Sequence, residues 1–201
     1  MAPSASILFP TRGRPGYLRV ALASVAPQAR ERAAEIVVVE DGAEDAATAR
    51  IAADHGARYV ALGAPCGLNR ARNAAAAAAA GELLCYLDDD VEAWPGWLGA
   101  LLAAAAAHPG HEAFGGPIRA RLEGSRLRLC GREPAPVTTL DLGAEDRDAA
   151  LVWGANLTLR RAALERVGEF DPARSGPGDE EEWERRLTAP VRRWSTPARA
   201  T

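Results

Sequence analysis

Four short apolar runs alternate with helix-like segments over the first half of the chain, and this alternation restricts the fold more than any other feature. The runs are rich in the branched and aromatic side chains that strands favour. They are Ser6–Phe9, Ile36–Val39, Arg58–Leu62 and Leu83–Leu87. The second run is almost continuously apolar, which is typical of a strand covered on both faces. Repeated strand–helix units of this kind predict a mostly parallel sheet with helices on both faces.

The segments between these runs carry helix signals. Pro15 suits the first turn of a helix, and apolar residues follow it with the three–four spacing of a buried stripe. These residues are Leu18, Ala21, Leu22 and Val25. Further helices are expected from about 46 to 55, from 69 through an alanine run to 81, and from Trp94–Pro95 onward.

The composition is that of an ordinary globular protein, with 201 residues, a hydrophobic share of 48% and a net charge of −3. The length suits one domain, which we place at residues 1–187, followed by an irregular tail at 188–201. The arginines are scattered and form no basic block, so the sequence does not indicate a nucleic-acid surface. No apolar run is long enough for a transmembrane helix.

The cysteines and the N-terminus indicate the cellular compartment. Cys66, Cys85 and Cys130 are far apart and include no C-x-x-C pair, which argues against a disulfide framework and against a structural zinc site. The N-terminus leads almost directly into the first apolar run and lacks the regions of a signal peptide. Both observations predict a cytoplasmic protein, and peripheral association with a membrane stays open.

Three consecutive carboxylates, Asp88, Asp89 and Asp90, directly follow the fourth apolar run. Three adjacent negative charges repel one another, so a strand that ends in this triplet needs compensation from solvent or from a cation. Carboxylate oxygens suit Mg²⁺ or Mn²⁺ and do not distinguish between them. A solvated acidic loop is the plain alternative, and the triplet alone does not decide between the two.

Polar side chains also follow the other three predicted strands. The carboxyl ends of parallel strands meet at one edge of a sheet, where ligands bind in the crevice beyond the strands. The residues concerned are Thr11 and Arg12, Glu40 and Asp41, and Asn69, Arg70, Arg72 and Asn73. Each has an ordinary explanation by itself, such as a turn residue or a solvated basic face. Together with the acidic triplet they predict a site for both an anion and a cation.

Seven motifs occur in the order and spacing of one known group. They are FPTRGRP at 9–15, VVEDG at 38–42, GLNRARN at 67–73, LDDD at 87–90, GANLTLRRAAL at 154–164, VGEFD at 167–171 and GDEEEW at 178–183. With these motifs the chain resembles the inverting family-two glycosyltransferases over nearly all of residues 5–187. The resemblance implies an α/β GT-A fold, the Rossmann-like fold of nucleotide-diphospho-sugar transferases, with a mixed, mostly parallel sheet. The G-x-G-x-x-G turn of a dinucleotide-binding enzyme does not follow the first strand.

The resemblance implies a nucleotide-sugar donor, UDP- or dTDP-linked, and a hydroxyl acceptor. The residues that it places around the nucleotide are Pro10, Thr11, Arg12, Glu40, Asp41, Asn69, Arg72, Asp88 and Asp89. The acidic triplet corresponds to the DXD motif of the family, and Asp90 is the implied ligand of a divalent cation, Mn²⁺ or Mg²⁺. Such an ion neutralises the charge that develops on a departing diphosphate.

Inversion by direct displacement requires a base that removes the proton of the acceptor hydroxyl. The resemblance places this base at Glu180, with Asp179 as the second candidate. Relatives usually have Asp at this position, so the longer Glu side chain is a departure from the family pattern. Acidic residues in the first turn of a helix also interact favourably with the helix dipole, and this needs no catalytic role.

Trp153, Gly154 and Asn156 are implied to lie where the donor sugar meets the acceptor, with plain core packing as the alternative. Residues 120–151 match no motif of the family, and loops are expected at 133–136 and 145–148. This region varies with the acceptor in the family, so the sequence leaves open whether the acceptor is a glycan, a lipid-linked molecule or a small molecule.

The chain departs from the family pattern after Leu187, where relatives usually continue with another strand and often a histidine. A truncated nucleotide-sugar-binding domain without turnover, acting as a subunit or a degenerate copy, is therefore an alternative to an active transferase. A nucleotidyltransferase would share the metal at the strand end but needs a Gly-rich basic loop after the first strand. The oligomeric state stays open.

Overall fold

The fold is given by a computed structural model that describes residues 3–121, 140, 146–149, 151–174, 179–187 and 191–193. For Asp179 and for residues 191–193 it describes the backbone alone. The loop expected at 133–136 and most of the tail expected at 188–201 lie outside the described residues.

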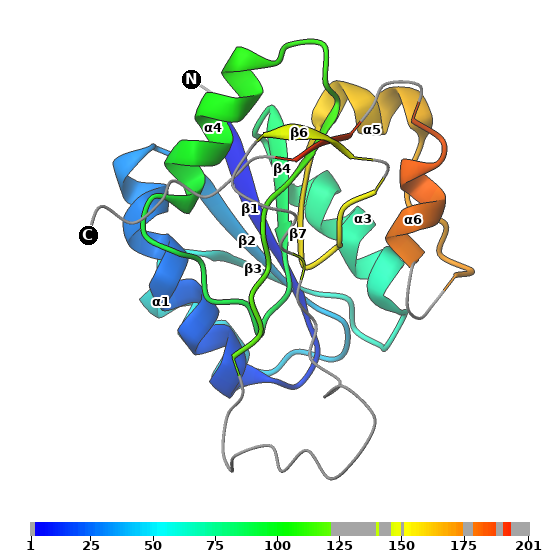
Figure 1. Cartoon of the computed structure of the whole chain (residues 1–201). Coiled ribbons are helices and arrows are strands. Elements are labelled where there is room, and N and C mark those ends of the chain that lie inside the picture. Colours follow the sequence, from blue (N-terminus) through cyan, green and yellow to red (C-terminus); the bar gives the residue numbers. More distant parts are fainter. Residues whose placement is uncertain are drawn as a thin grey trace, which may run out of the picture.

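In the described part of the chain, eight strands form one sheet in the order β3-β2-β1-β4-β7-β5-β8-β6. The strands are β1 (Ala5–Thr11), β2 (Glu35–Glu40), β3 (Arg58–Ala61), β4 (Leu83–Leu87), β5 (Ala113–Gly115), β6 (Arg147–Ala149), β7 (Asn156–Arg160) and β8 (Val191–Arg193). Strands β7 and β6 run antiparallel to the other strands. The sheet is therefore mixed and mostly parallel, as predicted (Figure 1).

Helices cover both faces of the sheet. They are α1 (Pro15–Glu31), α2 (Ala46–Asp54), α3 (Leu68–Ala78), α4 (Trp97–Ala107), α5 (Arg161–Val167) and α6 (Asp179–Glu184). One core lies beneath α1, α2 and α4, and a second lies beneath α3, α5 and α6. In Figure 1 these two groups of helices lie on opposite sides of the sheet.

Side-chain alternation along the strands supplies both cores. In β1, Ile7 and Phe9 belong to the core under α1, whereas Leu8 belongs to the core under α3. Successive side chains of a strand point to opposite faces, so a strand covered on both faces is apolar at nearly every position. This explains the continuous apolar runs of the sequence.

The chain reverses its direction across the sheet between β3 and β4. Strands β2 and β3 lie on one side of β1, and β4 lies on the other. The pairing of β1 with β4 extends only to Leu8 and Tyr86, and Pro10, which has no N–H to donate, lies beyond it. The two strands therefore separate at their carboxyl ends, at the kind of topological switch point where open α/β sheets bind ligands.

Two predicted helix boundaries differ from the structure. Helix α4 begins at Trp97 and not at Trp94–Pro95, because Gly96 adopts a left-handed conformation (φ 84°) and the Trp97 N–H closes a turn onto Trp94 O (3.0 Å). Helix α3 ends at Ala78 and not at 81. Beyond its end, the Arg161 guanidinium donates to carbonyl oxygens of the chain, a long-range contact that local sequence does not reveal.

Two short strands lie where irregular chain is expected. Strand β6 begins within the predicted loop at 145–148 and ends one residue beyond it, and β8 falls in the predicted irregular tail. The two strands pair with each other. Three-residue strands carry almost no periodic signal, so their pairing across some forty residues of sequence is decided by tertiary structure.

Within the described residues, no helix combines the length and the apolar character that crossing a bilayer requires.

Candidate active site

Thr11 and Asp41 meet at the carboxyl ends of β1 and β2. The Asp41 N–H donates to Thr11 O (2.8 Å), and both residues are buried. The Asp41 carboxylate accepts hydrogen bonds from the backbone N–H groups of Cys66 (2.6 Å) and Gly67 (3.1 Å). It thereby fixes the loop between β3 and α3 against the end of β2. Pro10 is buried within β1, and the Arg12 side chain is exposed just beyond this strand.

Glu40, the last residue of β2, is 3% exposed. Its Oε1 accepts a hydrogen bond from the Gly13 N–H (3.0 Å). Its Oε2 is buried and has no hydrogen-bond partner among the described residues. A buried carboxylate oxygen without a donor is costly, so this atom would gain from a donor supplied by a ligand.

The acidic triplet is held by Thr11 at the end of β1 and by Arg14 just after it. Thr11 Oγ1 donates to Asp89 Oδ2 (2.6 Å), and Arg14 binds both oxygens of the same carboxylate, with Nε 3.2 Å from Oδ2. Arg14 Nη1 also donates to Asp90 Oδ2 (3.1 Å). Asp89 is 2% exposed, whereas the Asp90 side chain is 45% exposed. The buried carboxylate is thus neutralised within the protein, and the exposed one reaches solvent.

Asp88, the first residue of the triplet, is partly buried. The pKa of its carboxyl is raised to about 6, mainly by burial; the charge of Arg72 opposes this, and the negative charges of Asp90, Asp89 and Glu180 add to it. Glu180 lies 92 residues further along the chain, so its effect on Asp88 means that the acidic helix α6 faces the end of β4.

Arg72 connects the triplet to α6. Its side chain is 3% exposed, and Nη2 lies 3.9 Å from Glu180 Oε2. Asn69 Oδ1 accepts a hydrogen bond from Arg72 Nη1 (3.0 Å), and the guanidinium lies 5.5 Å from the centre of the Phe170 ring. A cation held in this way sits between two groups of carboxylates, where it would also face an anionic ligand.

Gly154 allows the close approach of Arg72. A Cβ atom at this position would lie 2.5 Å from Arg72 Nη2 and 3.2 Å from Glu180 Cδ. The Gly154 N–H donates to Glu180 Oε1 (3.0 Å), so the predicted base already accepts one backbone hydrogen bond. The side chain of Asp179, the second candidate for this role, lies outside the described side chains.

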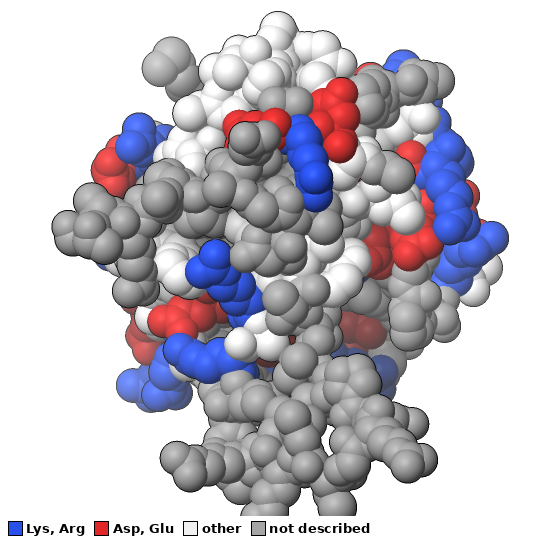
Figure 2. Space-filling view, in the orientation of Figure 1, with Lys and Arg blue, Asp and Glu red and all other residues white. Residues whose placement is uncertain are grey.

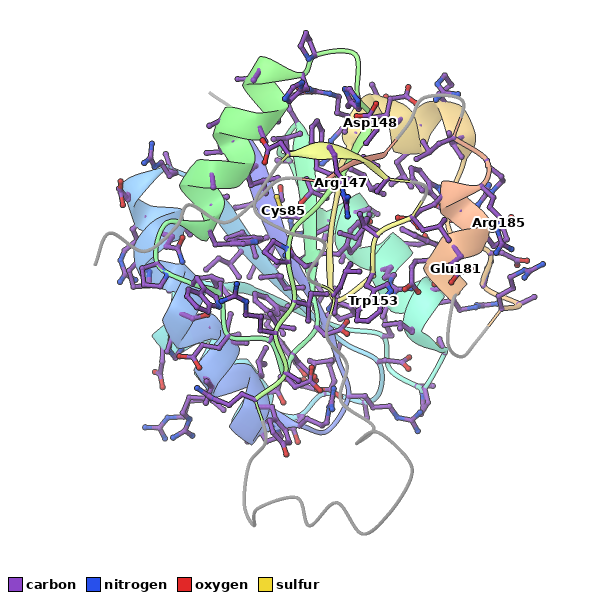
Figure 3. All side chains as sticks on the ribbon, in the orientation of Figure 1. Cys85, Arg147, Asp148, Trp153, Glu181 and Arg185 are labelled. Carbon is purple, nitrogen blue, oxygen red and sulfur yellow. The ribbon has the colours of Figure 1, made fainter. Side chains whose placement is uncertain are left out.

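The other two residues of the predicted sugar site lie on either side of Gly154. Trp153 is partly buried on the segment that leads into β7, and Figure 3 labels it there. Asn156 is 5% exposed, and its Oδ1 accepts a hydrogen bond from Trp97 Nε1 (3.1 Å) in α4. The side-chain amide of Asn156 is therefore hydrogen-bonded to α4.

Two residues of the site are absent from the sequence-based prediction. Arg14 follows β1 within the first motif and faces the triplet across the switch point. A basic residue just after a strand that ends at the site is the sequence feature that could have identified it. Glu184 is 3% exposed in α6, one helical turn after Glu180. Burial raises the pKa of its carboxyl to about 8. Its spacing from Glu180 is visible in the sequence, but its burial is not.

The described residues contain no group of three or more His, Cys, Asp or Glu side chains that could hold a metal ion by themselves. The exposed Asp90 carboxylate fits a divalent cation as one oxygen ligand, in place of its contact with Arg14, whereas Asp89 is buried and bound by both Thr11 and Arg14.

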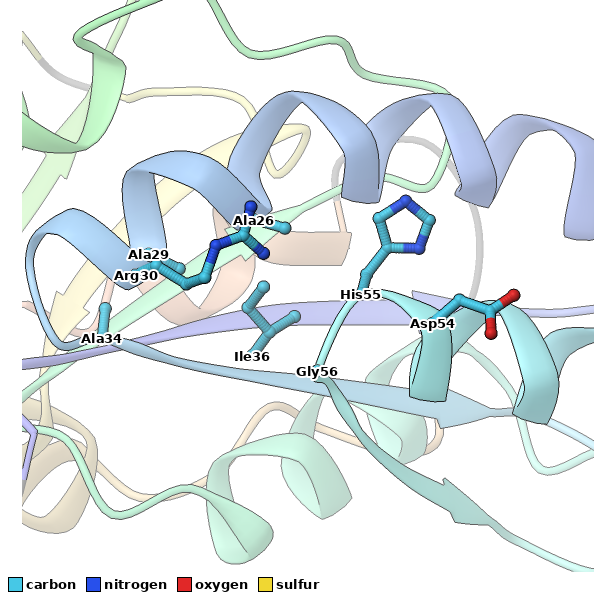
Figure 4. Close-up of a pocket in the computed structure, with 8 residues that line it drawn as sticks. All are labelled: Ala26, Ala29, Arg30, Ala34, Ile36, Asp54, His55 and Gly56. Carbon is cyan, nitrogen blue, oxygen red and sulfur yellow. The ribbon is translucent and has the colours of Figure 1, made fainter.

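A separate pocket lies at the opposite end of the sheet (Figure 4). It is lined by Ala26, Ala29, Arg30, Ala34, Ile36, Asp54, His55 and Gly56. These residues lie near the amino end of β2, away from the carboxyl ends where the polar residues converge.

On the described part of the face in Figure 2, basic and acidic side chains are interspersed and form no continuous basic patch.

Comparison with solved structures shows the same architecture. S. aureus TarS (residues 1–349) matches with a TM-score of 0.71 and 18% identity over 100% of this chain. A mannosyltransferase from Pyrobaculum calidifontis, solved in complex with GDP-Man and Mn²⁺, matches with a TM-score of 0.64 and 21% identity over 98% of this chain. The chain spans 59% and 55% of these two structures. The likeness confirms the predicted GT-A fold.

A search of curated protein sequences gave no match. The family model described as glycosyl transferase family 2 matches residues 6–168, which include β1 to β4, the acidic triplet and β7. This chain is a member of glycosyl transferase family 2, as its motifs predict, and has the GT-A fold.

Proposed function

We propose that this protein is a metal-dependent, inverting glycosyltransferase that moves a sugar from a UDP- or dTDP-linked donor to an acceptor hydroxyl. The observation that carries the proposal is the position of Arg72 between Asp88 and Glu180. One cation lies beside the candidate metal motif and beside the candidate base, so a bound diphosphate and the acceptor hydroxyl would meet at this point.

The nucleoside of the donor would lie at the ends of β1 and β2. Thr11, Glu40 and Asp41 converge there, and the buried Oε2 of Glu40 lacks a donor among the described residues. A nucleoside offers hydroxyl and ring N–H donors to such an oxygen. This supports a nucleoside pocket and does not distinguish uracil or thymine from guanine; the preference for UDP or dTDP rests on the family resemblance.

The Asp90 carboxylate would hold the divalent cation together with phosphate oxygens of the donor. Its exposure leaves it open to such an ion, which would supply electrostatic stabilisation of the departing diphosphate. The P. calidifontis mannosyltransferase was solved with Mn²⁺ and GDP-Man, which supports this role by similarity alone. Arg72 would add a second, fixed positive charge near the same phosphates.

Glu180 would act as the base. It accepts the proton of the acceptor hydroxyl while the acceptor oxygen bonds to the anomeric carbon, and the bond from that carbon to the diphosphate oxygen breaks. Attack from the side opposite the leaving group inverts the configuration. The Oε1 of Glu180 accepts the Gly154 N–H (3.0 Å), and its Oε2 lies 3.9 Å from Arg72 Nη2, so the carboxylate is held beside the positive charge that would face the diphosphate.

A transfer assay with nucleotide-sugar donors, acceptor mixtures and Mn²⁺ tests the proposal. We expect release of a nucleoside diphosphate and an inverted glycoside from wild-type protein, and normal donor binding without transfer from the Glu180→Gln variant. Wild-type rates in this variant would show that Glu180 is not the base. Donor binding without transfer in the wild-type protein, across all acceptors, would favour a binding domain without turnover, and release of pyrophosphate would indicate a nucleotidyltransferase.

A further inference from the structure

Two carboxyl groups of α6 hold one short segment of the chain. Glu180 Oε1 accepts a hydrogen bond from the Gly154 N–H (3.0 Å), and Glu184 Oε1 accepts one from the Val152 N–H (3.1 Å). Residues four apart lie on the same face of a helix, so the two side chains act on the segment from the same side. Trp153 lies between the two anchored N–H groups.

The segment also has no free space at either anchor. A Cβ atom at Gly115 would lie 2.3 Å from Val152 Cγ1, and a Cβ atom at Gly154 would lie 2.5 Å from Arg72 Nη2. Val152 is thus packed against β5, and Gly154 is packed against the guanidinium that faces the acidic triplet. Any shift of α6 relative to this segment would therefore move Glu180 relative to Arg72.

Glu184 occupies an environment that disfavours a charge. It is 3% exposed, and its Oε2 has no hydrogen-bond partner among the described residues. The charged groups that face it are Arg72 from α3 and Glu180 and Glu181 from its own helix. Burial is the largest of the effects that raise its pKa, to about 8, so the carboxyl is uncharged at neutral pH. Its carbonyl oxygen still accepts the Val152 N–H.

We propose that Glu184 is a positioning residue: its carboxyl anchors residues 152–154 and thereby sets the orientation of Glu180 between Gly154 and Arg72. This inference rests on the proposed function, in which Glu180 removes the acceptor proton. An uncharged Glu184 also leaves Glu180 as the one negative charge of the pair, so Arg72 is not neutralised by both. Ionisation of Glu184 would create a buried charge with an unpaired oxygen, which favours movement of this side chain towards solvent and release of the segment.

Three variants test the inference. Glu184→Gln keeps the acceptor oxygen and the neutral state, Glu184→Ala removes both anchoring atoms, and Glu181→Gln is the matched control from the same helix. Hydrogen exchange at the Val152 and Gly154 amides reads the anchoring without any need for activity. We expect faster exchange in Glu184→Ala, and exchange close to that of wild type in Glu184→Gln and in Glu181→Gln.

Kinetics read the effect on Glu180. Glu184→Ala should lower kcat about 10- to 100-fold, the scale of a small misplacement of a reacting group, with donor binding unchanged. Glu184→Gln should retain kcat near the wild-type value. The kcat of wild type should fall above about pH 8, and this fall should be absent from Glu184→Gln. The pH profile needs only the conservative variant, so it keeps the test if Glu184→Ala does not fold.

The outcomes separate the inference from the proposed function. Unchanged exchange and unchanged kcat in Glu184→Ala would overturn the positioning role, as would a Glu184→Gln protein as impaired as the alanine variant. In a further outcome, wild type transfers no sugar while hydrogen exchange at Val152 and Gly154 still depends on Glu184. In that case Glu184 anchors the segment, but the proposed function is wrong, and so is the catalytic role assigned to the anchoring.

Discussion

Arg14 and Asp89 form a two-point ion pair across the gap between β1 and β4. Arg14 Nε lies 3.2 Å from Asp89 Oδ2, and Nη2 binds Oδ1, while Nη1 continues to Asp90. Arg14 is half-exposed and Asp89 is buried, so a side chain at the surface pairs with a carboxylate inside the protein. Arg14 therefore supplies positive charge to Asp89 and Asp90, while Arg72 acts on Asp88.

Replacing Arg14 by Met should change both the stability of the fold and the affinity of Asp90 for a divalent cation. The buried Asp89 carboxylate would keep only its bond from Thr11, so the free energy of unfolding should fall by about 1–3 kcal/mol. Asp90 would lose a competing cation, so the affinity for Mn²⁺ without nucleotide should rise up to about fivefold, the worth of an exposed ion pair. Urea unfolding and calorimetric titration with Mn²⁺ measure the two quantities. Arg19→Met, on an exposed position of α1, is the control, and weaker Mn²⁺ binding by Arg14→Met would contradict the competing role.

Gly154→Ala should damage the site by steric displacement. The new methyl group would lie 2.5 Å from Arg72 Nη2 and 3.2 Å from Glu180 Cδ, so the guanidinium or α6 must move. We expect a loss of at least about tenfold in kcat/KM, because misplaced groups no longer act together. The same substitution at Gly110, where nothing lies within 4 Å of a Cβ atom, should leave the transfer rate unchanged. Equal rates in the two variants would show that the fit of Arg72 against Gly154 has no role in transfer.

Thiol labelling should report on the nucleoside pocket. Cys85 is fully buried, and burial raises the pKa of its thiol to about 12, so it should not react in the folded protein. Cys66 is partly exposed, and its N–H donates to Asp41. In a Cys130→Ser protein, a maleimide should modify Cys66 alone, as mass spectrometry of the peptides would show, and a bound nucleoside diphosphate should slow the reaction. Labelling of Cys85 at the same rate, or no protection by any nucleotide, would contradict the prediction.

The stability of the protein should depend on pH through Glu184. The folded state holds the Glu184 proton up to about pH 8, whereas the unfolded state releases it near the ordinary pKa of glutamate. The folded protein therefore binds more protons between these values, and its stability falls as the pH rises from about 5 to 8 and levels off above that. Glu184→Gln lacks this effect, so its advantage over wild type should grow across this range to the order of a few kcal/mol.

Urea unfolding of both proteins at intervals from pH 5 to pH 9 measures the difference. Glu181→Gln, which removes a carboxylate that is 38% exposed and paired with Arg185, should change the free energy of unfolding by less than about 1 kcal/mol. A Glu184→Gln advantage that is constant with pH would mean that this carboxyl is ionised in the folded protein throughout the range.

The central strands can be predicted from the sequence because their signal is local. β1, β2 and β4 lie between two helix layers, so they are apolar at successive positions, and each ends in polar residues at the same edge. That edge gives the location of the site, and family membership is confirmed independently. The roles of the individual residues, such as Asp90 at a metal and Glu180 as a base, stay predictions.

Other features depend on contacts between distant parts of the chain. Strands β6 and β8 are three residues long and exist through pairing with each other, and α3 ends next to an arginine from α5. Burial raises the pKa of Glu184, but the sequence does not distinguish this residue from the other acidic residues of α6. The pairing of Arg14 with the triplet likewise requires the strand order β1-β4, which a sequence of alternating elements does not specify.

Calorimetric titration with UDP, dTDP and GDP, each with and without Mn²⁺, tests the central claim most directly when wild type is compared with Asp90→Asn. GDP is included because the P. calidifontis structure contains GDP-Man. The account predicts that UDP or dTDP binds wild type much more tightly with Mn²⁺, and that Asp90→Asn loses this dependence on the metal. Binding that is independent of Mn²⁺, or metal-dependent binding that survives in Asp90→Asn, would contradict the assignment of a metal-assisted nucleotide-sugar site at the end of β4.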